Sequence, residues 1–427
     1  MKHYFFLLII SCFTSCVSKQ TGSYKITFIN TSSVDVKDKP VIIKREELTS
    51  EPIGKFPLFI SEKGDTIPSQ LDDLNGDNKW DEVFLLVSMP GGQSSNINLN
   101  WVDSMPVFQK RTNIRFGVRQ TVSSKVEPAL SDTFYANQLP HVIGYQHYQT
   151  DGATWENDKV AFRQYLDGRN SIDVFGKKVS YLTPEDVGIG KDGFTENNYS
   201  VMKNWGTDIL AVANSAGIGG FSLMFKDSLP RLGITEQDSL NNVDSTIINV
   251  LSKGPLRSRM KVRYMHWKPY GRDYAVEQTT SIWPGMYAYN NSVSFNHLRG
   301  DETMVVGLVN SNSDQPLKEM RIGPWVVLYT FDKQSVNKEW KLGLALILPW
   351  DSYLGYIEAP KKGSLSTTWL GKLRVENNIP VEYFAVAGWE LSGKEFQDAD
   401  HFKRYLMDLL NQMTSEVRVN ISRVSVK

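Results

Sequence analysis

Oxygen-bearing side chains recur at alternate positions in the segment from residue 73 to residue 82. The possible metal ligands are the side chains of Asp73, Asn75, Asp77 and Asp81 and the backbone carbonyl of Lys79. Ca²⁺ prefers about six to eight oxygen ligands, which a tight loop of this kind supplies. The pattern therefore predicts a structural calcium ion. The alternative is an acidic turn whose side chains accept hydrogen bonds from their own backbone.

A second segment, from Trp155 to Tyr165, places ionisable groups among aromatic ones. Its polar side chains include Glu156, Asn157, Asp158 and Arg163. On a strand, Glu156 and Asp158 would share one face, and Asn157 and Arg163 the other. The carboxylates could transfer protons, and Arg163 could bind a carboxylate with both arms of its guanidinium. The alternative is a salt-bridged sheet face without catalytic work.

A third segment, from Lys253 to Arg272, carries many cations and no acidic residue. Its alternating members are Arg257, Arg259, Lys261 and Arg263. On a strand these four would point to one face, about 7 Å apart. Such a row repels itself unless it meets acids of neighbouring strands or an anionic ligand, and arginine suits sulfate and carboxylate. Tyr264 and Trp267 would add aromatic surface nearby, as would the segment 283–290.

The elements that must position these groups read mainly as strands. Short apolar or alternating runs separated by turn residues fill residues 24–105, which predicts a small N-terminal β-sandwich. Longer strand patterns fill residues 106–427, which predicts a large antiparallel β-sandwich catalytic domain. The segment from Ala399 to Met413 repeats apolar residues at helical spacing and predicts a helix.

The N-terminus predicts export. A basic start, a short apolar run and Phe13-Thr14-Ser15-Cys16 are typical of a lipoprotein signal peptide over residues 1–16, with lipid attached to Cys16. Residues 17–23 read as a polar tether. The apolar run is shorter than the roughly 20 residues that cross a bilayer. We expect a lipid anchor as the sole membrane contact, on the periplasmic side of the outer membrane.

The amino-acid composition limits the kinds of ligand and covalent cross-link that the protein can have. The chain has 47 Lys and Arg and 47 Asp and Glu, a net charge of zero, which argues against nucleic-acid binding. The two cysteines are Cys12 and Cys16, so a chain processed at Cys16 would form no disulfide within itself. We expect an anionic oligosaccharide as the ligand and no cofactor for the chemistry.

Several motifs together resemble the DUF4861-type family of exported Bacteroidetes proteins, found among polysaccharide-degradation genes. They are Gln70 to Asp77 with Trp80-Asp81-Glu82, the Trp155–Tyr165 run, Trp205-Gly206-Thr207-Asp208, the glycine-rich segment 214–221 and Lys253-Gly254-Pro255-Leu256-Arg257. The resemblance covers most of the mature chain. It implies that the all-β large domain is a galactose-mutarotase-like sandwich.

The chain is also similar to the oligosaccharide dehydratases of ulvan-degrading marine Bacteroidetes. That resemblance implies elimination of water from a non-reducing-end glucuronic or iduronic acid, linked to sulfated rhamnose, to leave a 4,5-unsaturated uronic acid. Such an elimination needs a neutralised carboxylate, a base and an acid. We assign Arg163 and Asn157 as neutralisers, His147 or His266 as base, and Tyr264 or Glu156 as acid. The substrate-binding candidates are His141, Asn157, Asp158, Arg257, Arg259, Lys261, Arg263 and Trp267.

Three alternatives use the same residues differently. A polysaccharide or oligosaccharide lyase would expel a sugar in place of water. A non-catalytic glycan-binding lipoprotein would carry its cations on an open face, whereas an enzyme would carry them in a cleft. A glycoside hydrolase needs two carboxylates on opposite sides of the scissile bond, whereas Glu156 and Asp158 would lie on one side.

Overall fold

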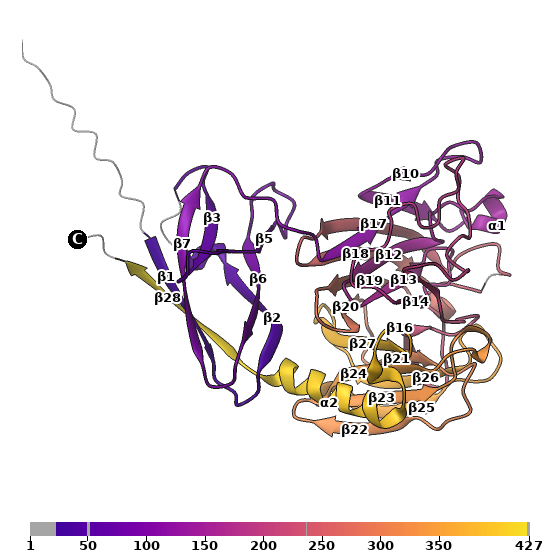
Figure 1. Cartoon of the computed structure of the whole chain (residues 1–427). Helices are drawn as coiled ribbons and strands as arrows, with labels where there is room; N and C mark the ends of the chain where they lie inside the picture. The colour runs from indigo at the N-terminus through magenta and orange to yellow at the C-terminus, as the bar shows by residue number, and fades with distance from the viewer. Residues whose placement is uncertain (1–22, 49–51, 236, 425–427) are drawn as a thin grey trace, which may run out of the picture.

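The computed structural model describes residues 23–48, 52–235 and 237–424, which form two β-sandwiches side by side (Figure 1). The all-β, two-sandwich architecture predicted from the sequence is confirmed. Among the described residues the α-helices are α1 (Pro140–Ile143) and α2 (Ala399–Thr414). No helix in these ranges is long and apolar enough to cross a membrane.

The small sandwich consists of a five-stranded sheet, in the order β28-β1-β7-β3-β4, and a three-stranded sheet, in the order β2-β6-β5. Its strands are β1 (Ser23–Asn30), β2 (Val36–Lys44), β3 (Phe56–Ser61), β4 (Thr66–Ile67), β5 (Ser69–Asp72), β6 (Glu82–Met89), β7 (Ser94–Val102) and β28 (Val417–Val424). Alternating apolar side chains such as Ile26, Phe59 and Leu99 fill the space between the two sheets.

The last strand departs from the predicted division at residue 106. β28 pairs with β1 along its whole length, from Ser23 opposite Val424 to Asn30 opposite Val417. Val419 and Ile421 pack against the core of the small sandwich. The chain thus returns through α2 to complete the sandwich in which it began, as the yellow helix and strand in Figure 1 show. The large sandwich therefore ends before residue 417.

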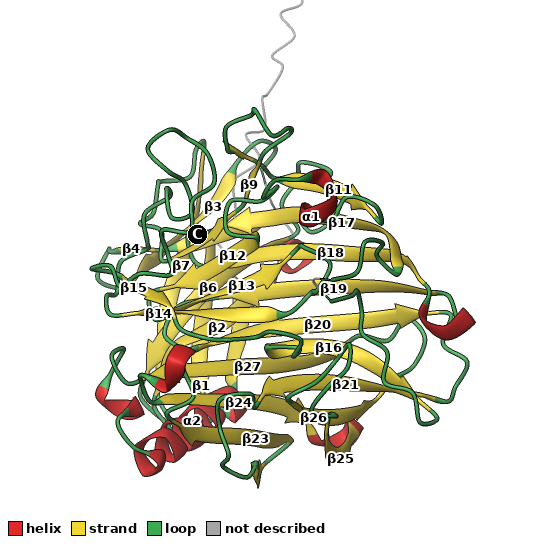
Figure 2. Ribbon diagram, turned by 90° about the vertical axis from the view of Figure 1, so that its right-hand side faces the viewer, coloured by secondary structure: helices red, strands yellow, loops and turns green. Residues whose placement is uncertain are grey.

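The large sandwich is built on a nine-stranded antiparallel sheet, in the order β11-β17-β18-β19-β20-β27-β24-β23-β22 (Figure 2). Its strands are β11 (Ser131–Tyr135), β17 (Val243–Lys253), β18 (Ser258–Trp267), β19 (Tyr274–Ile282), β20 (Ala288–Asn296), β27 (Val381–Trp389), β24 (Leu342–Pro349), β23 (Trp325–Asp332) and β22 (Lys318–Ile322). Along β18 buried and more exposed side chains alternate, so one face of the sheet is apolar and the other polar.

Two smaller sheets cover the apolar face. The five-stranded sheet contains β15 (Gly206–Asp208), β14 (Ile172–Lys177), β13 (Val160–Tyr165), β12 (Gly152–Asn157) and β8 (Thr112–Arg115). The four-stranded sheet contains β16 (Ile218–Phe225), β21 (Glu302–Val309), β26 (Thr368–Arg374) and β25 (Tyr353–Glu358). A separate two-stranded sheet pairs β9 (Gly117–Val118) with β10 (Glu127–Pro128). One continuous apolar core lies between the layers and includes Trp155, Tyr289 and Leu346.

Helix α2 lies on the opposite, outer face of the nine-stranded sheet. Its buried side chains are Phe402, Leu406, Leu409 and Leu410, which share one side at helical spacing. Phe402 packs over Gly343 of β24, where an added side chain would collide with the ring. Asp398 caps the helix by accepting a hydrogen bond from the His401 amide at 2.8 Å. The helix predicted from residues 399–413 is thus confirmed.

Two of the motifs that carry the resemblance, around Gln70 and Arg257, form the joint between the sandwiches. The Gln70 side chain accepts hydrogen bonds from the backbone amides of Leu256 and Arg257, at 2.8 and 2.9 Å. The Arg257 guanidinium bonds Asp72 and Glu82. Its Cζ atom lies over the Phe84 ring, 4.5 Å from the ring centre. Arg257, predicted to bind substrate, is therefore a buried structural residue whose charge is already compensated.

Candidate functional site

Glu156 belongs to a closed ionic network on the outer side of the five-stranded sheet. Its carboxylate contacts Arg115, accepts a hydrogen bond from Lys177 at 2.9 Å and another from the Thr183 amide at 3.0 Å. Burial opposes ionisation, but the charges of Arg115 and Lys177 lower the pKa of Glu156. An ionised carboxylate with every oxygen bonded inside the protein is a structural group, so the predicted acid role does not fit its position.

Arg163 lies in a second buried network, formed with Asp173 and Asp208. Tyr165 and Tyr199 stack beside its guanidinium at 4.2 and 5.2 Å. Two acidic side chains and two rings enclose this cation, which is 1% exposed. Arg163 is therefore committed to the fold, and the structure does not present it to a substrate as the sequence predicted.

The predicted acid Tyr264, on β18, lies against the core-facing side of β13, whereas Arg163 projects from the other side of β13. The Tyr264 hydroxyl accepts from Gln164 and donates to Gln278 at 3.0 Å, inside the core between the layers. Gln164 directly follows Arg163 on β13, so their side chains point to opposite faces. Burial raises the pKa of Tyr264. Arg163 and Tyr264 cannot share one active site.

The predicted histidines are also dispersed. His147 bonds Asp132 at 2.9 Å beside the edge strand β11, and Tyr148 donates to the same carboxylate at 2.9 Å. His266 lies exposed near the end of β18, 3.1 Å from Asp273. His141 is exposed on α1, and Trp267 is buried with its indole N–H donated to the Arg231 carbonyl. The structure does not bring these residues together.

Asn157 and Asp158 do reach a cavity, although indirectly. The Asn157 amide donates to the backbone carbonyls of Trp283 and Met286, at 2.7 and 2.8 Å. Asp158 accepts from the Gly285 amide at 2.9 Å. Both side chains therefore hold the turn at 283–286, and that turn lines the cavity described next. They act as positioning residues, which differs from the predicted contact with substrate.

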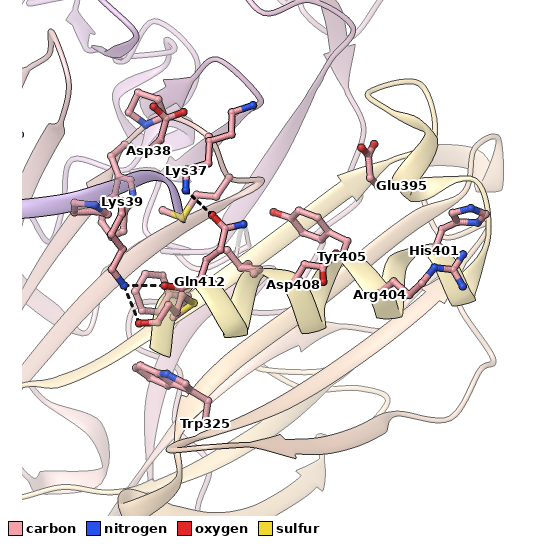
Figure 3. A pocket seen from close by; sticks show the side chains of 18 of the residues that line it. Lys37, Asp38, Lys39, Trp325, Glu395, His401, Arg404, Tyr405, Asp408 and Gln412 are labelled. Atoms are coloured by element: carbon pink, nitrogen blue, oxygen red, sulfur yellow. Dashed lines mark hydrogen bonds between the residues drawn. The ribbon is translucent and has the colours of Figure 1, made fainter. Parts of the chain in front are cut away.

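A cavity of about 720 Å³ lies where the small sandwich, helix α2 and the outer face of the nine-stranded sheet meet (Figure 3). We call it the junction cavity. Its lining comes from segment 37–40 of β2, the turn 283–286, the side chains of Trp325, Glu382 and Phe384, and segment 394–413. Each of the three bodies thus supplies one wall.

The floor of the junction cavity is aromatic. Trp283 and Trp325 both meet the Phe384 ring edge to face, each with ring centres 5.9 Å apart. Trp283 and Trp325 are partly exposed into the cavity. Flat apolar rings bordered by polar groups suit ligands that have one apolar and one polar side, as sugar rings do.

The wall formed by α2 carries the polar groups. His401, Arg404, Tyr405, Asp408 and Gln412 recur at helical spacing, so they share a helix face that adjoins the buried stripe. The His401 Nδ1 lies 2.6 Å from Asp398, which leaves Nε2 for another partner. The Tyr405 hydroxyl accepts from the Tyr287 amide at 2.8 Å, and burial raises its pKa.

Ionic contacts fix the small sandwich at the rim. Arg111 bonds both oxygens of Asp38, at 2.7 and 2.9 Å, and reaches Asp158 at 3.2 Å. The Lys39 ammonium donates to the last carbonyls of α2, those of Gln412 and Met413, at 2.8 and 2.9 Å (Figure 3). These contacts give the junction cavity defined walls.

The outer face of the nine-stranded sheet connects the junction cavity to the cations of β18. Strand pairing aligns Arg259, Ser281, Asn290 and Phe384 in one cross-strand row, and Lys261, Thr279, Ser292 and Glu382 in the next. Arg259, Lys261 and Arg263 point outward, while Met260, Val262 and Tyr264 are buried. The predicted alternation is confirmed for these three cations. Lys261 pairs with Glu277 at 2.9 Å.

The predicted calcium loop forms a turn closed by its own backbone. Asp73 accepts from the amides of Asn75, Gly76 and Asn78, and Asp77 accepts from the amide of Lys79. Asp81 accepts from the Leu74 amide at 2.7 Å. Among the described residues, no three His, Cys, Asp or Glu side chains are grouped to hold a metal ion. The acidic-turn alternative accounts for these bonds, and calcium stays a prediction. Cys16 lies outside the described residues.

Sequence reasoning missed the α2 wall. The signal was available, because His401, Arg404, Tyr405, Asp408 and Gln412 are as periodic as the apolar stripe. A polar helix face usually meets solvent, however, and nothing in the sequence shows that the small sandwich closes over it.

The model of the family described as "Domain of unknown function (DUF4861)" matches residues 29–419. "Uncharacterized protein P7" of Formosa agariphila is 25% identical over 291 residues, which cover 64% of this chain and 68% of that protein.

Two solved structures from Enterococcus faecalis also match. One is an α-mannosidase, with a TM-score of 0.46 and 9% identity, covering 94% of this chain and 46% of the mannosidase chain. The other is a protein in glycosyl hydrolase family 38, with a TM-score of 0.43 and 10% identity, covering 94% and 47%. The chain spans about half the length of these structures.

Proposed function

The chain belongs to the DUF4861 family of domains of unknown function, and we propose that it binds an acidic oligosaccharide in the junction cavity and eliminates water from the terminal uronic acid. The observation that carries this proposal is that the aromatic floor and the cations of β18 share one face of one sheet. A sugar stacked on Trp283 or Trp325 would continue towards positive charge.

The reaction breaks the C5–H bond of the uronic acid, forms the C4–C5 double bond and breaks the C4–O bond. The proton from C5 passes to a base, and the leaving hydroxide takes a proton to become water. A cation beside the carboxylate stabilises the charge that develops when C5 loses its proton. The product is a 4,5-unsaturated uronic acid, and the chain is not shortened.

In this proposal His401 is the base. Among the described residues it is the histidine that lines the junction cavity. Asp398 accepts the Nδ1 proton, which orients the ring and leaves Nε2 to take the proton from C5. Arg404 lies one helical turn from His401 and forms no ion pair within the described ranges, so it is suited to neutralise the carboxylate. Glu395 and Tyr405 are the two candidates for the acid.

Two competing functions remain as outcomes of the test. A lyase would use the same base and neutraliser but would expel a sugar. A non-catalytic binder would leave the oligosaccharide unchanged.

The test is incubation of the mature protein with a sulfated oligosaccharide that ends in a uronic acid, followed by mass spectrometry. We expect a product lighter by one water, together with the ultraviolet absorbance of an unsaturated uronate. Two shorter products would show a lyase instead. An unchanged mass with measurable binding would show a non-catalytic binder, and no binding would overturn the proposal.

We also propose that the protein is exported and anchored to a membrane by lipid on Cys16, facing the periplasm. Support comes from the sequence of residues 1–16. Replacing Cys16 with Ser should abolish incorporation of radiolabelled palmitate and release the protein from the membrane fraction. Unchanged labelling of the variant would contradict the assignment.

A further inference from the structure

Arg259 is in a different electrostatic situation from the other cations of its segment. Arg257 is neutralised by Asp72 and Glu82, and Lys261 is paired with Glu277. Arg259 is partly buried, and no hydrogen bond or ion pair reaches its guanidinium from the described residues. Burial lowers the pKa of Arg259 and the neighbouring charge of Arg257 lowers it further, against the opposing effect of the carboxylates of Asp72 and Glu82.

Such a residue costs stability. Removing a cation from water without a partner is unfavourable, and a second cation beside it adds repulsion. A glutamine would fit the same position on β18 without either cost. Asp72 and Glu82 are bonded to Arg257 and act on Arg259 only from a distance, so an anionic ligand would supply the direct partner that the described residues do not give its guanidinium.

The surroundings of Arg259 are suited to a sugar. The hydroxyls of Ser281, Thr279 and Ser292 lie between Arg259 and the junction cavity, and none of them makes a hydrogen bond within the described ranges. Asn290 continues the row, and its side-chain oxygen is likewise without a donor there. These groups can donate to and accept from the hydroxyls of a sugar.

We infer that Arg259 is an anion-binding subsite that holds a sulfate or carboxylate group on an inner sugar of the bound oligosaccharide. The inference rests on the proposed function and adds the direction in which the bound oligosaccharide runs across the sheet. Arg259 and Phe384 lie in one row, three strand spacings or about 14 Å apart. The oligosaccharide thus crosses β27, β20 and β19 from the junction cavity to β18.

The test is calorimetric titration of Arg259→Gln with a sulfated, uronate-containing oligosaccharide, its desulfated form and its carboxyl-reduced form. We expect affinity for the first to fall by about 10- to 100-fold, as for a lost charge-assisted hydrogen bond. The melting temperature should stay the same or rise, because a partnerless cation is removed. If the variant and the original protein bind the desulfated form equally, Arg259 holds a sulfate. If they bind the carboxyl-reduced form equally, Arg259 holds a carboxylate.

Arg423→Gln is the matched control, since Arg423 is exposed on β28 of the small sandwich, and we expect no change in affinity. Equal binding of the Arg259 variant, to a ligand that the original protein binds, would overturn the subsite and leave the proposed function standing. A large drop in melting temperature would also overturn it, because it would show a structural role. If the original protein binds none of the three ligands, both the function and the subsite fail.

Discussion

The side-chain amide of Asn157 donates to the backbone carbonyl of Trp283 at 2.7 Å, across 126 residues of sequence. The same amide reaches the Met286 carbonyl, and its oxygen accepts from the amides of Lys159 and Val160. One asparagine therefore joins the β12–β13 turn to the turn that supplies part of the aromatic floor. Through these hydrogen bonds, the segment from Trp155 to Tyr165 helps to position one wall of the junction cavity.

Replacing Asn157 with Ala should weaken both folding and binding. Two buried carbonyls and two amides would lose their partner, which costs about 1–3 kcal/mol for each group that stays unsatisfied. The turn carrying Trp283 would lose its anchor, so oligosaccharide affinity should fall. Asn198→Ala is the control, because Asn198 bridges Gly188 and Ile189 in a loop outside the junction cavity. Denaturation should show both variants destabilised, while titration should show weak binding for Asn157→Ala alone.

The aromatic floor gives a second prediction. Trp325→Ala should lower the affinity for a uronate-terminated oligosaccharide by about tenfold, because a sugar loses its stacking surface. Trp369→Ala serves as control, since Trp369 is also partly buried but lies on β26, outside the lining of the junction cavity. Comparable affinity losses in both variants would indicate general destabilisation and would count against the floor as a binding surface.

His401→Gln should separate catalysis from binding. The glutamine can still bond Asp398 but cannot accept a proton at neutral pH, so kcat should fall by about 100- to 10,000-fold. KM should change little, because the aromatic floor and the cations of β18 are intact. His266→Gln should keep full turnover, since His266 is exposed at the far end of β18. A His401 variant with undiminished kcat would remove this residue from the mechanism.

Sequence patterns were informative where an element acts alone. The alternation of Arg259, Lys261 and Arg263 and the apolar spacing of α2 both fixed which side faces the core. They failed where function depends on distant contacts. Opposite faces of β13 separate Arg163 from Tyr264, and β28 reaches β1 across nearly the whole chain. Strand alternation assigns a residue to a face but does not show which segment covers that face.

Glu156 offers a test of a structural role. Glu156→Gln should destabilise the protein by about 3–5 kcal/mol, because Arg115 and Lys177 would remain buried without their counter-charge. The kcat of the folded fraction should not change, since Glu156 is 1% exposed and its carboxylate is bonded to Arg115, Lys177 and Thr183. Chemical denaturation and active-site titration of the refolded variant measure the two quantities. A specific loss of kcat with unchanged stability would restore Glu156 as an acid.

The pH dependence of stability should carry the signature of Asp208. Burial and then the charge of Asp173 raise the pKa of Asp208 to about 8, against the opposing effect of Arg163. An unfolded aspartate has a pKa of about 4. Between these values the folded protein binds more protons than the unfolded chain, so this group lowers stability as pH rises from about 4 to about 8. Asp208→Asn cannot ionise, and its stability should therefore fall less steeply over that range.

Asp132 provides a control of opposite sign. Burial would raise its pKa, but hydrogen bonds from His147 and Tyr148 lower the pKa below its usual value. The folded state then binds fewer protons than the unfolded chain, so Asp132 adds stability as pH rises through the usual aspartate range, and Asp132→Asn should lose this gain. Urea denaturation from about pH 2 to about pH 8 measures all three proteins, because the Asp132 gain falls at and below the usual aspartate pKa of about 4. Parallel curves for Asp208→Asn and the original protein would show that Asp208 is ionised in the folded protein over this pH range, as it is in the unfolded chain.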